Sequence, residues 1–138
     1  MRYLSREWLA AAGEALADSP GLRDAIRDLS LTLEQTVTDG PEGTVRWHLV
    51  LDHGDARLVA GPADRSDLRF ETSYRVARAI ALGELAAPMA FIAGNLRVGG
   101  DLNLLTAHQR LLSTIDDVLV DVRKATTFAG APLGPSIP

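Results

Sequence analysis

The 138-residue sequence contains no cysteine and only one lysine, Lys124. Without cysteine the chain has no disulfide, no thiol nucleophile and no thiolate metal ligand, so those classes of chemistry are excluded. No apolar run approaches the roughly 18 residues that a membrane-spanning helix needs. Arg6, Glu7 and Glu14 interrupt the first segment where a secretory signal would be continuously apolar. We therefore expect this segment to be a folded helix and the protein to be cytoplasmic.

A basic surface for nucleic acid is also missing. The net charge is −4 and the arginines are interspersed with acids rather than gathered in a stripe, so we expect no nucleic-acid partner. His48 and His108 lack the spacing of a metal-binding pair, and Asp116, Asp117 and Asp121 are expected on a solvated helix face. We therefore expect no metal and no other cofactor.

What is present is the composition of an ordinary globular protein, with 46% hydrophobic and 23% charged residues. The length is typical of one domain. We assign residues 1–125 to a single domain that includes an N-terminal helix at 5–18. Residues 126–138 are rich in proline and glycine, and we expect a tail that is mobile or lies over the surface.

Hydrophobic periodicity predicts both strands and helices. Alternating apolar and polar residues predict strands at 29–37, 44–52, 56–60, 68–72 and 95–99. Helical periodicity predicts helices from Ser73 to Gly83, at 86–93 and, the longest, at 103–124. Short turns between the early strands favour an antiparallel meander. The predicted fold is α+β, a five-stranded, mainly antiparallel sheet with helices packed on one face.

Residues 91–105 read FIAGNLRVGGDLNLL. The paired glycines, Gly99 and Gly100, suggest a phosphate-binding loop, but a Walker lysine and a third glycine at the required spacing are both missing. We expect instead that Gly94 ends a helix in the left-handed conformation, and that the glycine pair bends a strand or admits a close neighbour. Asp101 is placed to cap the helix that follows.

The segment from Met89, MAFIAGNLRVGGDLNLL, resembles the signature of the sterol carrier protein type-two family. The matching positions are Phe91, Gly94, Leu96, Val98, Gly100, Asp101 and Leu104. The likeness extends roughly over residues 29 to 123 and is strongest from Phe70 to Leu105. It implies a five-stranded sheet with helices over one face, enclosing an apolar tunnel that holds a fatty acid, an acyl-CoA, a sterol or a similar lipid.

Such a tunnel would be lined by apolar residues on the inward faces of these elements, although core packing alone would also explain each of them. The candidates are Phe70, Tyr74, Ile80, Met89, Phe91, Ile92, Leu102, Leu105, Leu112 and Leu119. His108 lies at the centre of the apolar stripe of the 103–124 helix. It either contacts a ligand head group, acts as an acid or base, or is a histidine at the core edge bonded to the backbone.

Three functions stay open at this stage. The first is a soluble lipid-binding or lipid-transfer protein that holds an apolar molecule in a tunnel, performs no chemistry and is not stably inserted in a membrane. The second is a cofactor-independent isomerase or cyclase acting on a hydrophobic substrate, with His108 as acid or base. The third is an interaction module that uses the apolar stripe of residues 104–122, which would also suit a homodimer seam. The sequence favours the first.

Overall fold

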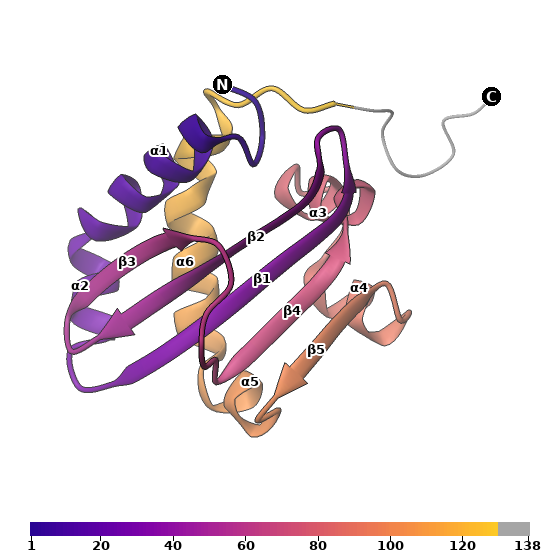
Figure 1. Ribbon diagram of the computed structural model, residues 1–138. Coiled ribbons are helices and arrows are strands. Elements are labelled where there is room, and N and C mark those ends of the chain that lie inside the picture. The colour runs from indigo at the N-terminus through magenta and orange to yellow at the C-terminus, as the bar shows by residue number, and fades with distance from the viewer. Residues whose placement is uncertain (130–138) are drawn as a thin grey trace.

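The computed structural model describes residues 1–129 of the chain. Five strands form one sheet in the order β3-β2-β1-β4-β5, and helices cover one of its faces (Figure 1). In chain order the elements are α1 (Arg6–Ala17), α2 (Pro20–Ala25), β1 (Ser30–Gly40), β2 (Gly43–Asp52), β3 (Asp55–Ala60), β4 (Leu68–Ser73), α3 (Tyr74–Ala81), α4 (Ala87–Ile92), β5 (Leu96–Gly100), α5 (Asn103–Ala107) and α6 (Gln109–Arg123). Three of the four strand pairings are antiparallel, which confirms the predicted α+β fold.

The predicted meander is correct for β1, β2 and β3 and wrong for β4. This strand pairs with β1 in parallel, with Leu68 opposite Leu33. The last residue of the preceding loop, Asp67, is hydrogen-bonded to β1: its carboxylate accepts a hydrogen bond from the Thr32 backbone N–H at 2.7 Å. The alternation of apolar residues shows which face of a strand is buried, but it does not show which strand lies beside it. The pattern therefore did not reveal that β4 crosses over to pair with β1.

Serine side chains begin several of the helices. Ser5 accepts a hydrogen bond from the Trp8 N–H at 3.2 Å, and Ser73 accepts one from the Val76 N–H at 3.3 Å. These bonds satisfy backbone donors that a helix N-terminus leaves free. Both caps agree with the sequence pattern, and Ser73 turns the chain directly from β4 into α3.

The predicted continuous helix at 103–124 is wrong at one point, because it breaks at His108 into α5 and α6. The backbone of His108 has φ −119° and ψ 31°, which is outside the helical region. Backbone hydrogen bonds nevertheless continue on both sides, from the His108 N–H to the Leu104 oxygen and from the Leu112 N–H to the His108 oxygen. The apolar residues stay in phase across the break, so the periodicity did not reveal it.

The glycine-rich segment is a junction between a strand and a helix. Gly94 follows α4 with φ +81°, the left-handed conformation that was expected. Gly100 has φ +96°, and a Cβ there would lie 2.3 Å from the backbone oxygen of Asp67. Both the conformation and the close approach therefore require glycine. The Asp101 carboxylate accepts a hydrogen bond from the Asn103 N–H at 3.1 Å, near the start of α5.

Two clusters of buried side chains hold the helices on the sheet. The larger comprises Leu16, Leu22, Ile26, Leu31, Leu33, Leu49, Leu51, Ala56, Leu68, Leu111 and Ile115. The second contains Trp8 and Trp47, whose ring centroids are 6.1 Å apart in an edge-to-face contact. A fully buried leucine contributes about 1.5–3 kcal/mol, so these clusters fix α1, α2 and α6 against the sheet.

The two ends of the described chain lie side by side. The Tyr3 N–H donates to the Thr127 oxygen at 2.9 Å, and the Thr127 N–H donates to the Met1 oxygen at 2.7 Å. The Ala129 N–H donates to the hydroxyl of Tyr74 at 3.1 Å. Residues 126–129 therefore lie against the start of the chain. The rest of the expected tail, residues 130–138, is outside the described residues, and the domain boundary at residue 125 stays a prediction.

Candidate functional site

The helix layer covers the two halves of the sheet unequally. On β1 and β2 most of the inward side chains are almost completely buried, with Leu33 and Leu51 each 1% exposed. On β4 and β5 the paired residues Phe70 and Val98 occupy the same inward face but are only half-buried. The β4–β5 half of the sheet therefore keeps an apolar surface that the helices leave partly uncovered.

Leucines of α5 and α6 border this surface. Leu105, Leu112 and Leu119 are half-buried and pack against the larger core cluster. They are spaced seven residues apart, so they follow one side of the helical segment. We use the term inner apolar surface for these three leucines together with Phe70 and Val98. It contains four of the side chains that the sequence named as tunnel candidates, and their contact with a ligand stays a prediction.

Other candidates lie elsewhere. Tyr74 is 7% exposed in the second core cluster, and Ile80 is half-buried on α3. The remaining four are exposed rather than packed in the core, to 59%, 42%, 76% and 47% in the order Met89, Phe91, Ile92 and Leu102. The reason is local: α4 has only six residues and buries Ala90 alone. These side chains flank β5 and remain candidates for ligand contact.

Val98 is a residue that the sequence analysis left out of the tunnel candidates. The signal was present, because Leu96 and Val98 alternate with Arg97, a pattern that places the two apolar side chains on one face of a strand. Its place opposite Phe70 on the inner apolar surface became visible only with the register of β4 and β5.

An aromatic cluster closes the end of the sheet where β1 turns into β2. The Tyr3 ring lies between Trp8, Tyr74 and Phe128, at centroid distances of 5.1, 5.7 and 4.8 Å. Burial, followed by the charges of Tyr74 and Asp116, raises the pKa of the Tyr3 hydroxyl far above its ordinary value. Tyr3 is therefore a neutral packing residue at physiological pH and not a base.

His108 does not form an acid–base pair in the described chain. Its ring is half-buried at the α5–α6 junction and makes no hydrogen bond with another residue among 1–129. Asp116, Asp117 and Asp121 are exposed, as the helix pattern predicted. Whether the ring contacts a ligand stays a prediction.

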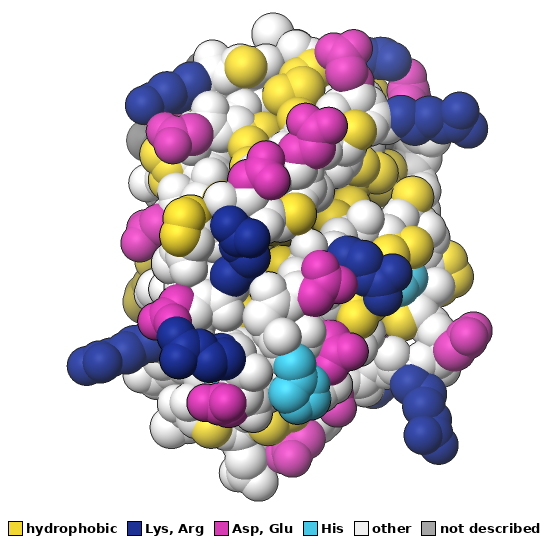
Figure 2. All heavy atoms as spheres, turned by 90° about the vertical axis from the view of Figure 1, so that its left-hand side faces the viewer, with side chains coloured by type: hydrophobic (Ala, Val, Ile, Leu, Met, Phe, Trp, Pro, Cys, Tyr) yellow, Lys and Arg dark blue, Asp and Glu magenta, His cyan; other side chains and the backbone are white. Residues whose placement is uncertain are grey.

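The part of the chain that the structure describes contains no cluster of metal ligands. Within residues 1–129, no three His, Asp or Glu side chains lie close enough together to hold a metal ion. In the same part of the chain, no helix is long and apolar enough to cross a membrane. Figure 2 shows charged side chains of both signs interspersed with apolar ones on the side of the molecule where α1 and α2 lie.

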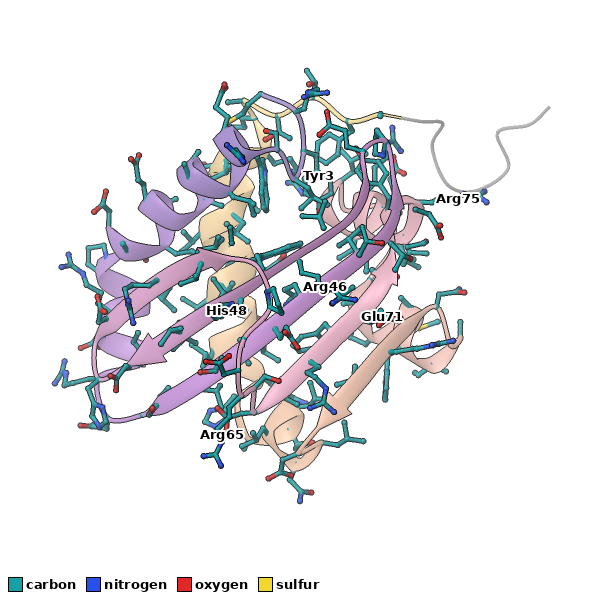
Figure 3. All side chains as sticks on the ribbon, in the orientation of Figure 1. Tyr3, Arg46, His48, Arg65, Glu71 and Arg75 are labelled. Atoms are coloured by element: carbon teal, nitrogen blue, oxygen red, sulfur yellow. The ribbon has the colours of Figure 1, made fainter. Side chains whose placement is uncertain are left out.

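The opposite face of the sheet is polar, and no helix of residues 1–129 lies over it (Figure 1). Arg46, His48 and Glu71 lie on this open face, which is turned towards the viewer in Figure 3. The His48 Nδ1 lies 2.9 Å from the backbone oxygen of Gly61, which ties β2 to the loop after β3. Two clefts are present on this face, and charged side chains line both of them. The sheet thus separates a charged outer face from the inner apolar surface.

Comparison with known proteins places this arrangement in a family. Several solved structures share the fold, including the following three. A conserved hypothetical protein of Thermus thermophilus is 23% identical, with a TM-score of 0.70 over 99% of this chain and 94% of its own. A crystal structure of sterol carrier protein 2 is 22% identical, with a TM-score of 0.71 over 87% and 98%. The palmitated sterol carrier protein 2-like 2 of Aedes aegypti is 17% identical, with a TM-score of 0.54 over 80% and 94%.

At these identities the structural likeness establishes the fold. No curated protein sequence matches the chain. A profile of the SCP-2 sterol transfer family matches residues 11–113, which span β1 to β5 and both halves of the sheet. Since this match covers well over half of the sequence, the chain belongs to the SCP-2 sterol transfer family.

Proposed function

We propose that this protein binds one apolar molecule, such as a fatty acid, an acyl-CoA or a sterol, on the inner apolar surface. The observation that carries the proposal is the half-exposure of Phe70 and Val98 on the inward face of the sheet. An acyl chain laid over them would bury apolar area on both partners, and each buried methylene contributes about 0.8 kcal/mol. The sheet and the helices α5 and α6 would then enclose the ligand.

Membership of the SCP-2 sterol transfer family supports a lipid-binding role in general. The palmitated relative makes a fatty acid the natural first ligand to test. In residues 1–129, no side chain is hydrogen-bonded to the His108 ring, so binding and release explain the site without a chemical step. We infer that the protein carries or stores its ligand in a soluble form.

The exposed helix α4 belongs to this proposal as the rim of the site. It packs on β5, the strand that carries Val98, and it presents Met89, Phe91 and Ile92 to solvent. A contiguous group of exposed apolar side chains is typical of a surface that meets a ligand or a partner. We propose that these side chains contact the part of the ligand that extends beyond the inner apolar surface.

To test the proposal, palmitate is titrated into delipidated protein and the heat of binding is measured by calorimetry. Val98→Glu places a carboxylate on the inner apolar surface and should weaken palmitate binding by at least about tenfold, because a charge cannot be buried there without a partner. The matched control is Val59→Glu, which makes the same change on the other edge strand, where Val59 is 36% exposed and points to the open face. The control should bind as the wild type does.

Two results would contradict the proposal. One is equal loss of affinity in both variants, which would place the ligand away from the inner apolar surface. The other is the absence of heat and of any change in melting temperature when the wild-type protein meets palmitate, palmitoyl-CoA and cholesterol in turn.

A further inference from the structure

The open face of the sheet carries charged side chains in a regular arrangement. The strand register places two rows side by side across β2, β1, β4 and β5, namely Arg46–Thr36–Glu71–Arg97 and His48–Glu34–Arg69–Gly99. Thr36 and Gly99 are small, so the long side chains around them surround a depression. This depression is a cleft of about 360 Å³ lined by members of both rows.

The carboxylates at this cleft are already engaged. The Glu71 carboxylate lies 3.8 Å from the guanidinium of Arg97. The Glu34 carboxylate accepts a hydrogen bond from the Ala63 N–H at 2.9 Å, which directs it towards the loop after β3 and the neighbouring cleft. By contrast, the guanidinium groups of Arg46 and Arg69 form no ion pair or hydrogen bond with another residue among 1–129. Two uncommitted guanidinium groups therefore line the same cleft from either side of β1.

Gly99 determines where one of these groups lies. A Cβ on Gly99 would be 2.8 Å from Nη2 of Arg69 and 3.3 Å from its Cζ. The guanidinium of Arg69 therefore rests against the bare backbone of β5. Any side chain at position 99 would push it away from this place. The glycine thus has a role on the outer face that differs from that of Gly100, whose neighbour is the backbone of Asp67.

We propose that this cleft binds the phosphate group of a small soluble phosphate ester, with Arg46 and Arg69 as the donors. Guanidinium groups present paired N–H donors that match the oxygens of phosphate and carboxylate. A phosphate dianion offers two such groups more oxygens and more negative charge than a carboxylate monoanion does. The strand register places the charged side chains of the cleft on the face opposite to the inner apolar surface, and the same segments of β4 and β5, at Phe70 and Val98, border both. This inference does not rest on the proposed lipid-binding function.

The probe is glycerol 3-phosphate, titrated into ¹⁵N-labelled protein, with glycerol as the ligand control. The amide signals of Thr36 and Gly99 should shift and saturate with the phosphate and remain unchanged with glycerol. Arg69→Gln should weaken binding by about tenfold or more. Arg57→Gln is the matched control, because Arg57 lies on the same face of β3 but is paired with Asp55 at 3.3 Å, and it should change the affinity by less than about twofold.

Gly99→Ala tests whether the phosphate binds at a site of defined geometry or is only attracted by the positive charge of the arginines. The variant keeps every charge and displaces the Arg69 guanidinium, so binding should weaken in the same sense as in Arg69→Gln. The backbone of Gly99 is outside the left-handed region, so alanine is accommodated there, and a thermal melt verifies folding. An unchanged affinity in Gly99→Ala would overturn the proposal. So would shifts that never saturate, or Arg69-dependent binding to phosphatidic acid vesicles without binding to glycerol 3-phosphate.

Discussion

Gly100→Ala should be among the most destabilising single substitutions in this chain. The new Cβ would lie 2.3 Å from the Asp67 oxygen and 3.0 Å from its carbonyl carbon, both of which are backbone atoms that cannot rotate away. Position 100 also has φ +96°, which L-residues rarely adopt. Backbone strain of about 1–3 kcal/mol plus displacement of β5 from β4 gives a loss of about 3 kcal/mol. For a domain of this size that corresponds to a fall in melting temperature of roughly 10 °C.

Gly94→Ala is the matched comparison, because Gly94 has φ +81° but a Cβ there would meet no atom within 4 Å. Only backbone strain remains in that variant, so its cost should be about 1 kcal/mol. Urea unfolding followed by circular dichroism measures both values. If the two variants lose equal stability, the close approach of Asp67 to Gly100 does not constrain this junction, and the reasoning is refuted.

Three further predictions concern single side chains. Ser73→Ala removes the hydrogen bond to the Val76 N–H and should lower the free energy of unfolding by about 1 kcal/mol in urea titrations; no change would contradict the cap. Partial burial, followed by the Asp117 carboxylate, raises the pKa of Asp116, so the folded state holds this proton more tightly than the unfolded chain. The free energy of unfolding should therefore fall as pH rises from the ordinary to the raised pKa, and Asp116→Asn should lose that fall when both proteins are unfolded across acidic pH. His108→Leu should leave palmitate affinity within about twofold in calorimetry, whereas a tenfold loss would make the ring a head-group contact.

Local features of the fold follow directly from the sequence. Alternation identified the buried faces of β1 and β2, serines at positions 5 and 73 marked helix starts, and Gly94 marked a helix end. Each of these depends on a few neighbouring residues and their backbone hydrogen bonds. These local preferences predict the folded structure correctly because the tertiary contacts favour the same local conformations.

Features that depend on distant partners could not be predicted. The parallel pairing of Leu68 with Leu33 depends on the path of the loop between β3 and β4. The alternation of apolar residues within a strand carries no information about that path. The exposure of Ile92 follows from α4 being too short to pack more than Ala90, which helical periodicity cannot show. The inner apolar surface includes Phe70 and three leucines that the sequence named as candidates, and their contact with a ligand stays a prediction. The arginines of the outer face are scattered along the sequence, and Arg46 and Arg69 share a cleft only through the sheet register.

The central claim is that an apolar ligand lies on the inner apolar surface and not on the open face. The most direct test is the measurement of intermolecular nuclear Overhauser effects between palmitate and the ¹³C-labelled methyl groups of the protein. We expect contacts from the acyl chain to Val98 and Leu112, on the inward side of the sheet. Contacts only to Val59 on the open face, or none at saturating palmitate, would contradict it.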